Sequence, residues 1–282
     1  MIKPVLQGDA FLEDVSRARR IPDQMHLWWL GQSGYLIQWQ NRHLLVDPYL
    51  SESLTKKYVV TNKPHTRMTE RVIAPDRLDF VDVVTSSHNH TDHLDGETLT
   101  PLLQNNPALT VVVSRANIYF TAERLQISPE LLTPIGVNEA PLTIGAFSFE
   151  AIPSAHELLE QDENGDHRFI GLVIKIGKWS LYHSGDCVPY NELAQKLKRW
   201  KIDVALLPIN GRDPGRVVAG NFNGAEAASL GKEIDAELVI PCHYEMFEFN
   251  TVSPNGFIQA AKEINQPYQV LKCGERMSLI PR

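Results

Sequence analysis

The sequence His-Asn-His-Thr-Asp-His, at residues 88–93, places four metal-ligating side chains within six positions. In an extended segment alternate side chains point to the same side, so the imidazoles of His88 and His90 can hold one metal ion together. Asp92 and His93 follow at the point where the chain is expected to turn into a helix. Their side chains therefore point in a different direction from those of His88 and His90. This arrangement predicts a second metal ion beside the first.

Three more candidate ligands, His156, Asp186 and His243, follow apolar runs farther along the chain. They are needed because a metal ion takes about four to six ligands, and one turn cannot complete two sites. The resulting assignment is His88, His90 and His156 for one ion and Asp92, His93 and His243 for the other, with the Asp186 carboxylate bridging both.

The two divalent metal ions predicted at these residues indicate that the protein is a hydrolase. Paired metal ions lie roughly 3.5–4 Å apart and can share a water that ionises near neutral pH, so the expected nucleophile is a bridging hydroxide. Asp92 and Asp186 are the expected catalytic residues because they would hold and orient that hydroxide, with Asp92 accepting a proton as the intermediate collapses. A mixed imidazole and carboxylate set accepts Zn²⁺, Mn²⁺ or Fe²⁺.

Short apolar, β-branched runs alternate with stretches of helical periodicity, which predicts an α/β fold. The Gly177-Lys178 pair is typical of a tight hairpin turn, so the sheet is expected to be mixed. No internal repeat or linker interrupts the pattern, which predicts a single hydrolase domain over residues 1–282. The expected strands are 26–30, 35–39, 44–46, 81–85, 110–114, 147–152, 170–176, 180–183, 204–209 and 238–241. The expected helices are 97–104, 115–125, 190–200, 225–234 and 256–264, and the expected loops are 51–75 and 158–168.

Composition is that of a globular chain with a sizeable core. Of 282 residues, 43% are hydrophobic and 22% charged, and 27 Lys and Arg against 34 Asp and Glu give a net charge of −7. A general nucleic-acid binder is expected to be basic, so the expected partner is a small-molecule substrate and not nucleic acid. The sequence shows no secretory apolar segment and no run of about 20 apolar residues, which predicts a cytoplasmic protein that does not bind membranes.

The three cysteines, Cys187, Cys242 and Cys273, form no CxxC pair and fit a reducing compartment. Cys187 and Cys242 each adjoin a proposed ligand. Because neighbours on a strand face opposite sides, these two thiols are expected to face away from the metals and pack in the core.

Taken together, these motifs resemble the metallo-β-lactamase superfamily, in which His-x-His-x-Asp-His is followed by separate His, Asp and His motifs in that order. Leu-Leu-Val-Asp-Pro at residues 44–48 is similar to the superfamily's early strand, so the resemblance gives Asp47 a role in supporting the ligand turn. It implies a fold that is an αββα sandwich of two mixed β-sheets flanked by helices, with the metals at one edge.

Within the superfamily, the chain is most similar to the branch that contains L-ascorbate-6-phosphate lactonase. The similarity lies in Trp-Trp-Leu-Gly at 28–31, Tyr-His-Ser-Gly-Asp at 182–186 and Ile-Asp-Val-Ala at 202–205. It implies a lactonase for a sugar or sugar-phosphate lactone, and a homo-oligomer. The branch favours Mn²⁺, whereas the superfamily as a whole favours Zn²⁺.

Substrate contacts are expected from two loops that contain His65, Arg67, Asn210 and Arg212. An Arg near two metal ions can hold a phosphate or carboxylate, although exposed loop arginines are as often without a ligand. His183 shares a strand with Asp186, and it either supports a ligand from behind or has buried partners of its own.

Other activities use the same ligand set. The alternative enzyme is a phosphodiesterase for small or cyclic phosphodiesters, since a nuclease would need a nucleic-acid-binding module that this acidic chain does not show. Di-iron proteins of the superfamily that reduce oxygen or nitric oxide resemble His-x-Glu-x-Asp, and His90 stands here in place of that Glu. A metal-binding scaffold without activity is the remaining alternative.

Overall fold

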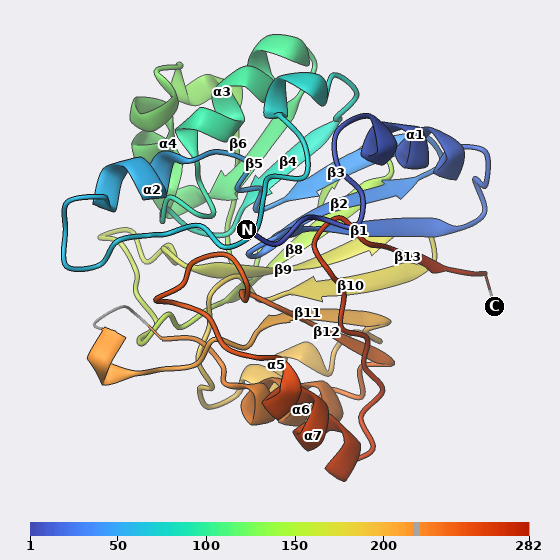
Figure 1. Cartoon of the computed structure of the whole chain (residues 1–282), viewed down its shortest axis with the longest axis vertical. Coiled ribbons are helices and arrows are strands. Elements are labelled where there is room, and N and C mark those ends of the chain that lie inside the picture. Colours follow the sequence, from blue (N-terminus) through green and yellow to red (C-terminus); the bar gives the residue numbers. More distant parts are fainter. Residues whose placement is uncertain (217–219, 282) are drawn as a thin grey trace.

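The computed structural model describes residues 1–216 and 220–281. Its strands form two sheets that pack face to face (Figure 1). The seven-stranded sheet contains β1 (Met25–Gly31), β2 (Gly34–Trp39), β3 (Arg42–Val46), β4 (Val83–Ser86), β5 (Thr110–Ser114), β6 (Leu132–Ile135) and β13 (Arg276–Leu279). The six-stranded sheet contains β7 (Leu142–Ile144), β8 (Phe147–Pro153), β9 (Ile170–Ile176), β10 (Trp179–His183), β11 (Val204–Pro208) and β12 (Leu238–Cys242).

Helices lie outside both sheets. They are α1 (Asp9–Ala18), α2 (Ser53–Tyr58), α3 (Gly96–Asn105), α4 (Ile118–Leu125), α5 (Leu193–Leu197), α6 (Gly224–Glu233) and α7 (Asn255–Glu263). The described part of the chain also contains 3₁₀ turns, namely η1 (Pro75–Arg77), η2 (Arg115–Asn117), η3 (Pro129–Leu131) and η4 (Pro214–Arg216). In Figure 1, α3 and α4 lie beyond one sheet and α5, α6 and α7 beyond the other. No helix in the described part of the chain has the length and apolar character of a bilayer-crossing segment.

Both sheets are mixed. The first runs in the order β13-β1-β2-β3-β4-β5-β6, antiparallel from β13 to β3 and parallel from β3 to β6. The second runs in the order β12-β11-β10-β9-β8-β7, parallel from β12 to β10 and antiparallel beyond. The expected αββα sandwich of two mixed sheets is therefore confirmed. The hairpin at Gly177 is also confirmed, because β9 and β10 pair antiparallel and Gly177 has a φ of 59°.

Apolar side chains cover both faces of the central strands because each sheet is buried on both sides. All seven residues of β1 are buried. On its outer face, the Trp28 ring packs edge-on against Phe11 of α1, and its indole N–H donates to Asp14 at 3.0 Å. Such strands appear in the sequence as continuous apolar runs instead of alternating ones.

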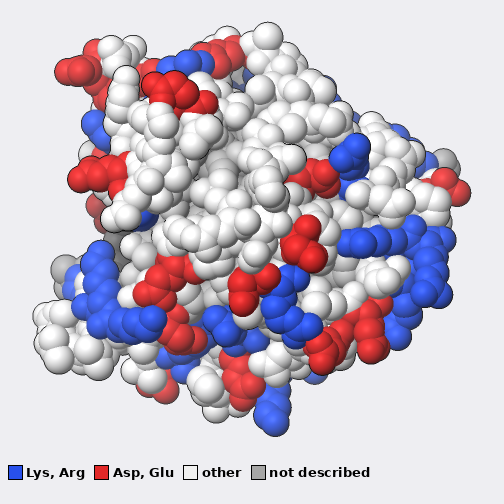
Figure 2. All heavy atoms as spheres, turned by 90° about the horizontal axis from the view of Figure 1, so that it is seen from above, with Lys and Arg blue, Asp and Glu red and all other residues white. Residues whose placement is uncertain are grey.

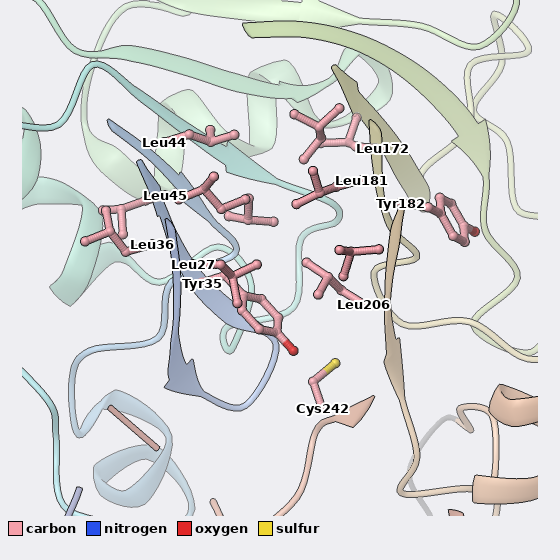
Figure 3. Packing of buried hydrophobic residues seen from close by; sticks show 14 of the residues in the cluster. Leu27, Tyr35, Leu36, Leu44, Leu45, Leu172, Leu181, Tyr182, Leu206 and Cys242 are labelled. Atoms are coloured by element: carbon pink, nitrogen blue, oxygen red, sulfur yellow. The ribbon is translucent and has the colours of Figure 1, made fainter. Parts of the chain in front are cut away.

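The layer between the sheets is the main hydrophobic core (Figure 3). Leu27 and Tyr35 of the first sheet face Leu181 and Leu206 of the second, whereas the ring of Tyr182 lies on the opposite side of its strand. Cys242 points into this layer as well. Cys187 is fully buried in the same core, so the prediction that these thiols pack as core residues is confirmed.

Several elements differ from the sequence-based expectation. The expected loop 51–75 contains α2 and the first residue of η1, and the expected helix 190–200 is helical only over Leu193–Leu197 because Glu192 has a left-handed φ of 74°. The sequence analysis missed α1, although Phe11, Val15 and Ala18 form a buried stripe at helical spacing. It also missed β6, β7 and β13, which are short strands at sheet edges, where pairing with a neighbour decides their structure.

Charged groups of both signs are interspersed on the face shown in Figure 2. They surround a broad area without charged side chains. That face therefore carries no strong field of a single sign.

Candidate metal centre

The candidate ligands converge because four strands end at the same edge of the sandwich. The motif at 88–93 follows β4, and His156, Asp186 and His243 follow β8, β10 and β12. β4 belongs to one sheet and the other three strands to the second. The site therefore lies where the two sheets meet, and neither sheet completes it alone.

Among the described residues three overlapping groups of candidate ligand atoms form at this edge, and two of them are the groups that the sequence predicted. Within each group the ligand atoms all lie within 4.8 Å of one another. The two predicted groups are His88, His90, His156 and Asp186, and Asp92, His93, Asp186 and His243, and the third consists of Asp47, His88 and His93.

Asp186 belongs to both groups. Its Oδ1 lies 3.2 Å from His93 Nε2, and its Oδ2 lies 3.5 Å from the Nε2 atoms of both His156 and His243. One carboxylate thus faces imidazoles of both proposed sites, as a bridging ligand must.

Buried atoms without hydrogen-bond partners test whether these residues fit metal ions. In the described chain, His88 Nε2, His93 Nε2 and Asp186 Oδ1 are buried and make no hydrogen bond. Buried polar atoms are nearly always paired, and unpaired ones that face each other are typical of an ion site. Imidazole nitrogen and carboxylate oxygen suit Zn²⁺, Mn²⁺ or Fe²⁺, so the residues present fit two such ions.

Several candidate histidines have a hydrogen-bonding partner at Nδ1, the ring nitrogen that faces away from the site. His93 Nδ1 lies 2.7 Å from Asp47 Oδ2, Asp47 Oδ1 accepts the Ser87 N–H at 2.9 Å, and Ser87 Oγ lies 3.0 Å from His88 Nδ1. His156 Nδ1 lies 2.8 Å from the Gly220 carbonyl oxygen. These contacts aim the Nε2 atoms at the site, and Asp47 has the supporting contact that the resemblance implied.

Burial and neighbouring charges shift the pKa values of the candidate ligands. Burial opposes the charge on Asp186, but the neighbouring imidazoles, His93 above all, hold its pKa well below the usual range. Burial likewise lowers the pKa of His243, but the Asp186 and Asp92 carboxylates outweigh it and raise that pKa to about 9. His88 lies beside other imidazoles, so burial and their charges both lower its pKa. The carboxylates therefore carry negative charge that two divalent cations would neutralise.

Three residues at the site have a left-handed backbone conformation. Gln32, Asp47 and His243 have φ values of 50°, 42° and 63°. Residues with side chains rarely adopt this left-handed region, and such strain persists where surrounding contacts enforce it. Asp47 and His243 end their strands in this conformation, which turns their side chains toward the ligand cluster.

An open pocket of about 530 Å³ has five of the candidate ligands at its floor: His90, Asp92, His156, Asp186 and His243. Its rim comes from α2 and the segment after it, from α4 and from the loop after β12. Apart from Asp92 and Asp186, the charged residues that line it in the described chain are cationic: Lys57, Lys63 and Arg124.

An aromatic cluster forms one wall of this pocket. The His65 ring stacks on Tyr58 at 4.4 Å and meets Phe249 at 4.5 Å and Phe247 at 5.0 Å. Burial lowers the pKa of His65, which favours its neutral form. His65 is thus the one predicted substrate contact that the structure brings to the pocket among the residues it describes.

The other three predicted substrate residues do not line this pocket. Arg67 is buried and donates to the carbonyl oxygens of Ser51 and Thr69, each at 2.7 Å. Arg212 forms an ion pair with Glu226 at the start of α6. These predictions placed arginines by loop position alone, which does not show whether a side chain points inward.

Asn210 acts behind the pocket. Its side chain bonds to Asn221 and Asn250, each at 3.0 Å, and both of these asparagines line the pocket. Asn210 itself does not line it, so it supports residues that do.

His183 is a buried histidine with partners of its own. Its Nε2 lies 3.0 Å from the Ser33 carbonyl oxygen, and its Nδ1 accepts the Gly185 N–H at 3.2 Å. It steadies the turn that carries Asp186 without touching a candidate ligand. Asn223 caps α6 by accepting the Glu226 N–H.

The sequence analysis missed Gln32 and Arg124 among the pocket residues. Gln32 lies beside two candidate ligands, and Arg124 Nη1 donates to the carbonyl oxygens of Asn89 and Leu94 at 2.8 and 2.9 Å. A signal for Gln32 was available, because it follows an apolar strand run as the ligands do. Nothing in the sequence distinguished Arg124 from other arginines near a helix end.

Comparison with known proteins gives the same picture. The UPF0173 metal-dependent hydrolase of Saccharolobus solfataricus is 24% identical over 262 residues, which cover 90% of this chain and 99% of that protein. A possible metal-dependent hydrolase from Veillonella parvula has a similar structure, with a TM-score of 0.71, 16% identity and coverage of 90% and 99%.

The metallo-β-lactamase fold protein YhfI of Bacillus subtilis is also similar in structure. Its TM-score is 0.65 at 21% identity, over 91% of this chain and 99% of that one. The family model described as "Beta-lactamase superfamily domain" matches residues 26–243, from the first strand of the sandwich to the last candidate ligand. With this match and the two ligand groups at the sheet edge, the chain belongs to the metallo-β-lactamase superfamily.

Proposed function

We propose that this protein is a hydrolase that uses two divalent metal ions, and that its substrate is the lactone of a sugar or sugar phosphate. The observation that carries the proposal is the pair of ligand groups that share Asp186 at the floor of an open pocket. The metal-dependent hydrolases among the similar proteins support the general activity. The lactone rests on the branch resemblance.

Lactone hydrolysis forms one bond from a water oxygen to the carbonyl carbon and breaks the ring C–O bond, and the leaving oxygen takes up a proton. When bound, two divalent metal ions would lower the pKa of that water and polarise the carbonyl. His88, His90 and His156 would hold one ion, and Asp92, His93 and His243 the other, with Asp186 shared. Asp92 lines the pocket, and its carboxylate is placed to take the proton from the water and return it to the leaving oxygen.

The residues at the rim of the pocket support the proposal that the substrate is a sugar phosphate. Aromatic faces such as those of Tyr58 and Phe249 line the pocket and can bind the apolar face of a sugar ring. Lys57 and Arg124 line the same pocket and can bind a phosphate or carboxylate. The cations at the rim take the role that the sequence analysis gave to Arg67 and Arg212.

The test is proton release in a pH-stat when metal-loaded protein meets L-ascorbate 6-phosphate, first with Mn²⁺ and then with Zn²⁺. The blank is the His90→Ala protein, which lacks a candidate ligand. We expect turnover that the variant loses. No turnover of this compound or of other sugar lactones in protein shown to hold two metal ions would overturn the lactonase proposal.

A small cyclic phosphodiester is the second candidate substrate. The aromatic wall favours it, because the stacked rings of Tyr58 and His65 can also bind a planar base. Hydrolysis of bis(p-nitrophenyl) phosphate by the same metal-loaded protein, with lactones untouched, would replace the lactonase proposal with this one.

A further inference from the structure

Gln32 is a buried side chain in contact with two candidate ligands that lie far from it in sequence. It occupies the turn between β1 and β2, lines the pocket and is 1% exposed. Its φ of 50° falls in the left-handed region, where Gly or Asn is usually found in a turn.

The amide group bridges members of the second ligand group. Gln32 Nε2 lies 2.7 Å from Asp92 Oδ2 and 2.9 Å from His243 Nε2. The orientation of the amide is settled by chemistry, because an ionised carboxylate only accepts hydrogen bonds and the NH₂ must face it. In the described chain Gln32 has no such contact with His88, His90 or His156 of the first group.

The backbone of Gln32 holds His243 a second time. Its carbonyl oxygen accepts the His243 N–H at 2.9 Å and the indole N–H of Trp29 at 3.0 Å. The Trp29 ring packs against Tyr244, the residue after His243, at 4.5 Å. The turn between β1 and β2 and the end of β12 are thus fixed to each other at both backbone and side chain.

We propose that Gln32 is a positioning residue for the second metal ion: its amide N–H holds Asp92, its backbone carbonyl holds His243, and together these contacts raise the metal affinity of that site alone. The inference rests on the two-metal function proposed above. It goes beyond that function because it states that the ligands of the two metal sites are held by different kinds of contact. The first group is held by Ser87 and the Gly220 carbonyl, and the second depends in addition on a neutral amide.

The test compares Gln32→Met with a matched control, Gln38→Met. Methionine keeps the length of the side chain but cannot donate to Asp92. Gln38 lies on β2 and is 2% exposed, and its amide faces Val15 and Arg19, away from the pocket. The control therefore loses a buried amide from the same hairpin without altering the site.

Metal-free proteins are titrated with Co²⁺ while visible absorption and heat are recorded. Wild type and Gln38→Met are expected to bind two equivalents with the same affinities. For Gln32→Met we expect an unchanged first equivalent and a second that binds roughly 10–100-fold more weakly, the usual cost of removing an outer support of a metal ligand. Gln32→Asn keeps the amide and suits the left-handed turn but is one methylene shorter, so we expect it to weaken the second equivalent as well.

Two results would overturn the inference. One is a second equivalent that Gln32→Met binds with wild-type affinity, and the other is an equal loss of both equivalents. Thermal unfolding of the metal-free variants shows whether each is folded before titration. The titration contains no substrate, so a failure of the lactonase proposal leaves its result interpretable.

Discussion

The floor and the rim of the pocket are built in opposite ways. The floor consists of ligands at the ends of four strands, most of them buried, and several are held by a second contact such as that between Asp47 and His93. The rim consists of a short helix, a helix end and two loops, and its cations include the exposed Lys57. The floor is rigid because the sheets fix it, and it sets the chemistry. The rim surrounds the part of the substrate that does not react, and it sets which substrate fits.

The largest effect is expected at the one floor residue shared by both ligand groups. Asp186→Asn removes the charge that faces three imidazoles, so both sites should lose metal. Metal ions supply several kcal/mol of transition-state stabilisation, so kcat/KM should fall by roughly 10³-fold. Steady-state kinetics and the metal content after dialysis measure it. Glu192→Gln, an exposed carboxylate beside Lys196, is the control that should change neither.

A smaller effect is expected at Asp47, which contacts a floor ligand without being assigned as a ligand itself. Asp47→Asn should weaken metal binding by up to about 100-fold, because the neutral amide holds His93 less firmly and makes its ring a weaker ligand. Metal titration gives the affinity. Wild-type affinity in this variant would mean that the sheets alone position the floor.

His43 provides the comparison with His243 of the floor, whose pKa is raised by neighbouring carboxylates. It is buried in β3, at the opposite end from Asp47, where burial and then Arg19 lower its pKa to about 4. The unfolded chain binds this proton near pH 6.5, so stability is lost as pH falls from 6.5 toward 4. The loss between pH 6.5 and pH 5 should be about 2 kcal/mol.

The free energy of unfolding in urea, measured across this pH range, is the readout for His43. Subtracting the His43→Gln curve from that of wild type removes the contributions that the two proteins share. Parallel curves would contradict the assigned pKa.

The smallest effect is expected at the rim. Lys57→Gln should raise KM for a phosphate-bearing substrate by less than about 5-fold, because an exposed ion pair contributes only about 0.2–1 kcal/mol. KM for an uncharged lactone should not change. Lys56→Gln is the matched control, because the adjacent Lys56 pairs with Glu97 at 2.8 Å and does not line the pocket. Equal effects of the two substitutions would mean that Lys57 acts only through the general field of α2.

Most strands, the mixed sheets and both ligand groups could be predicted from the sequence. The ligands were visible because His and Asp stand directly after apolar runs, where strands end. Asp47 was visible only through the resemblance, since a lone Asp after a strand is usually part of a turn. Short edge strands such as β13 were not visible, because their few residues become a strand only by pairing with β1.

The sequence alone indicated the chemistry, because metal ligation depends on residue types at fixed local spacing. In an extended segment, that spacing decides which side chains point to the same side. Only the tertiary structure revealed the rim and the supports. Gln32 reaches Asp92 across 60 positions and His243 across 211, and no local pattern records such contacts. Arg67 and Arg124 look alike in sequence, yet one donates to carbonyl oxygens in the interior and the other lines the pocket. Side-chain direction at a loop or helix end is set by packing, which depends on residues distant in the chain.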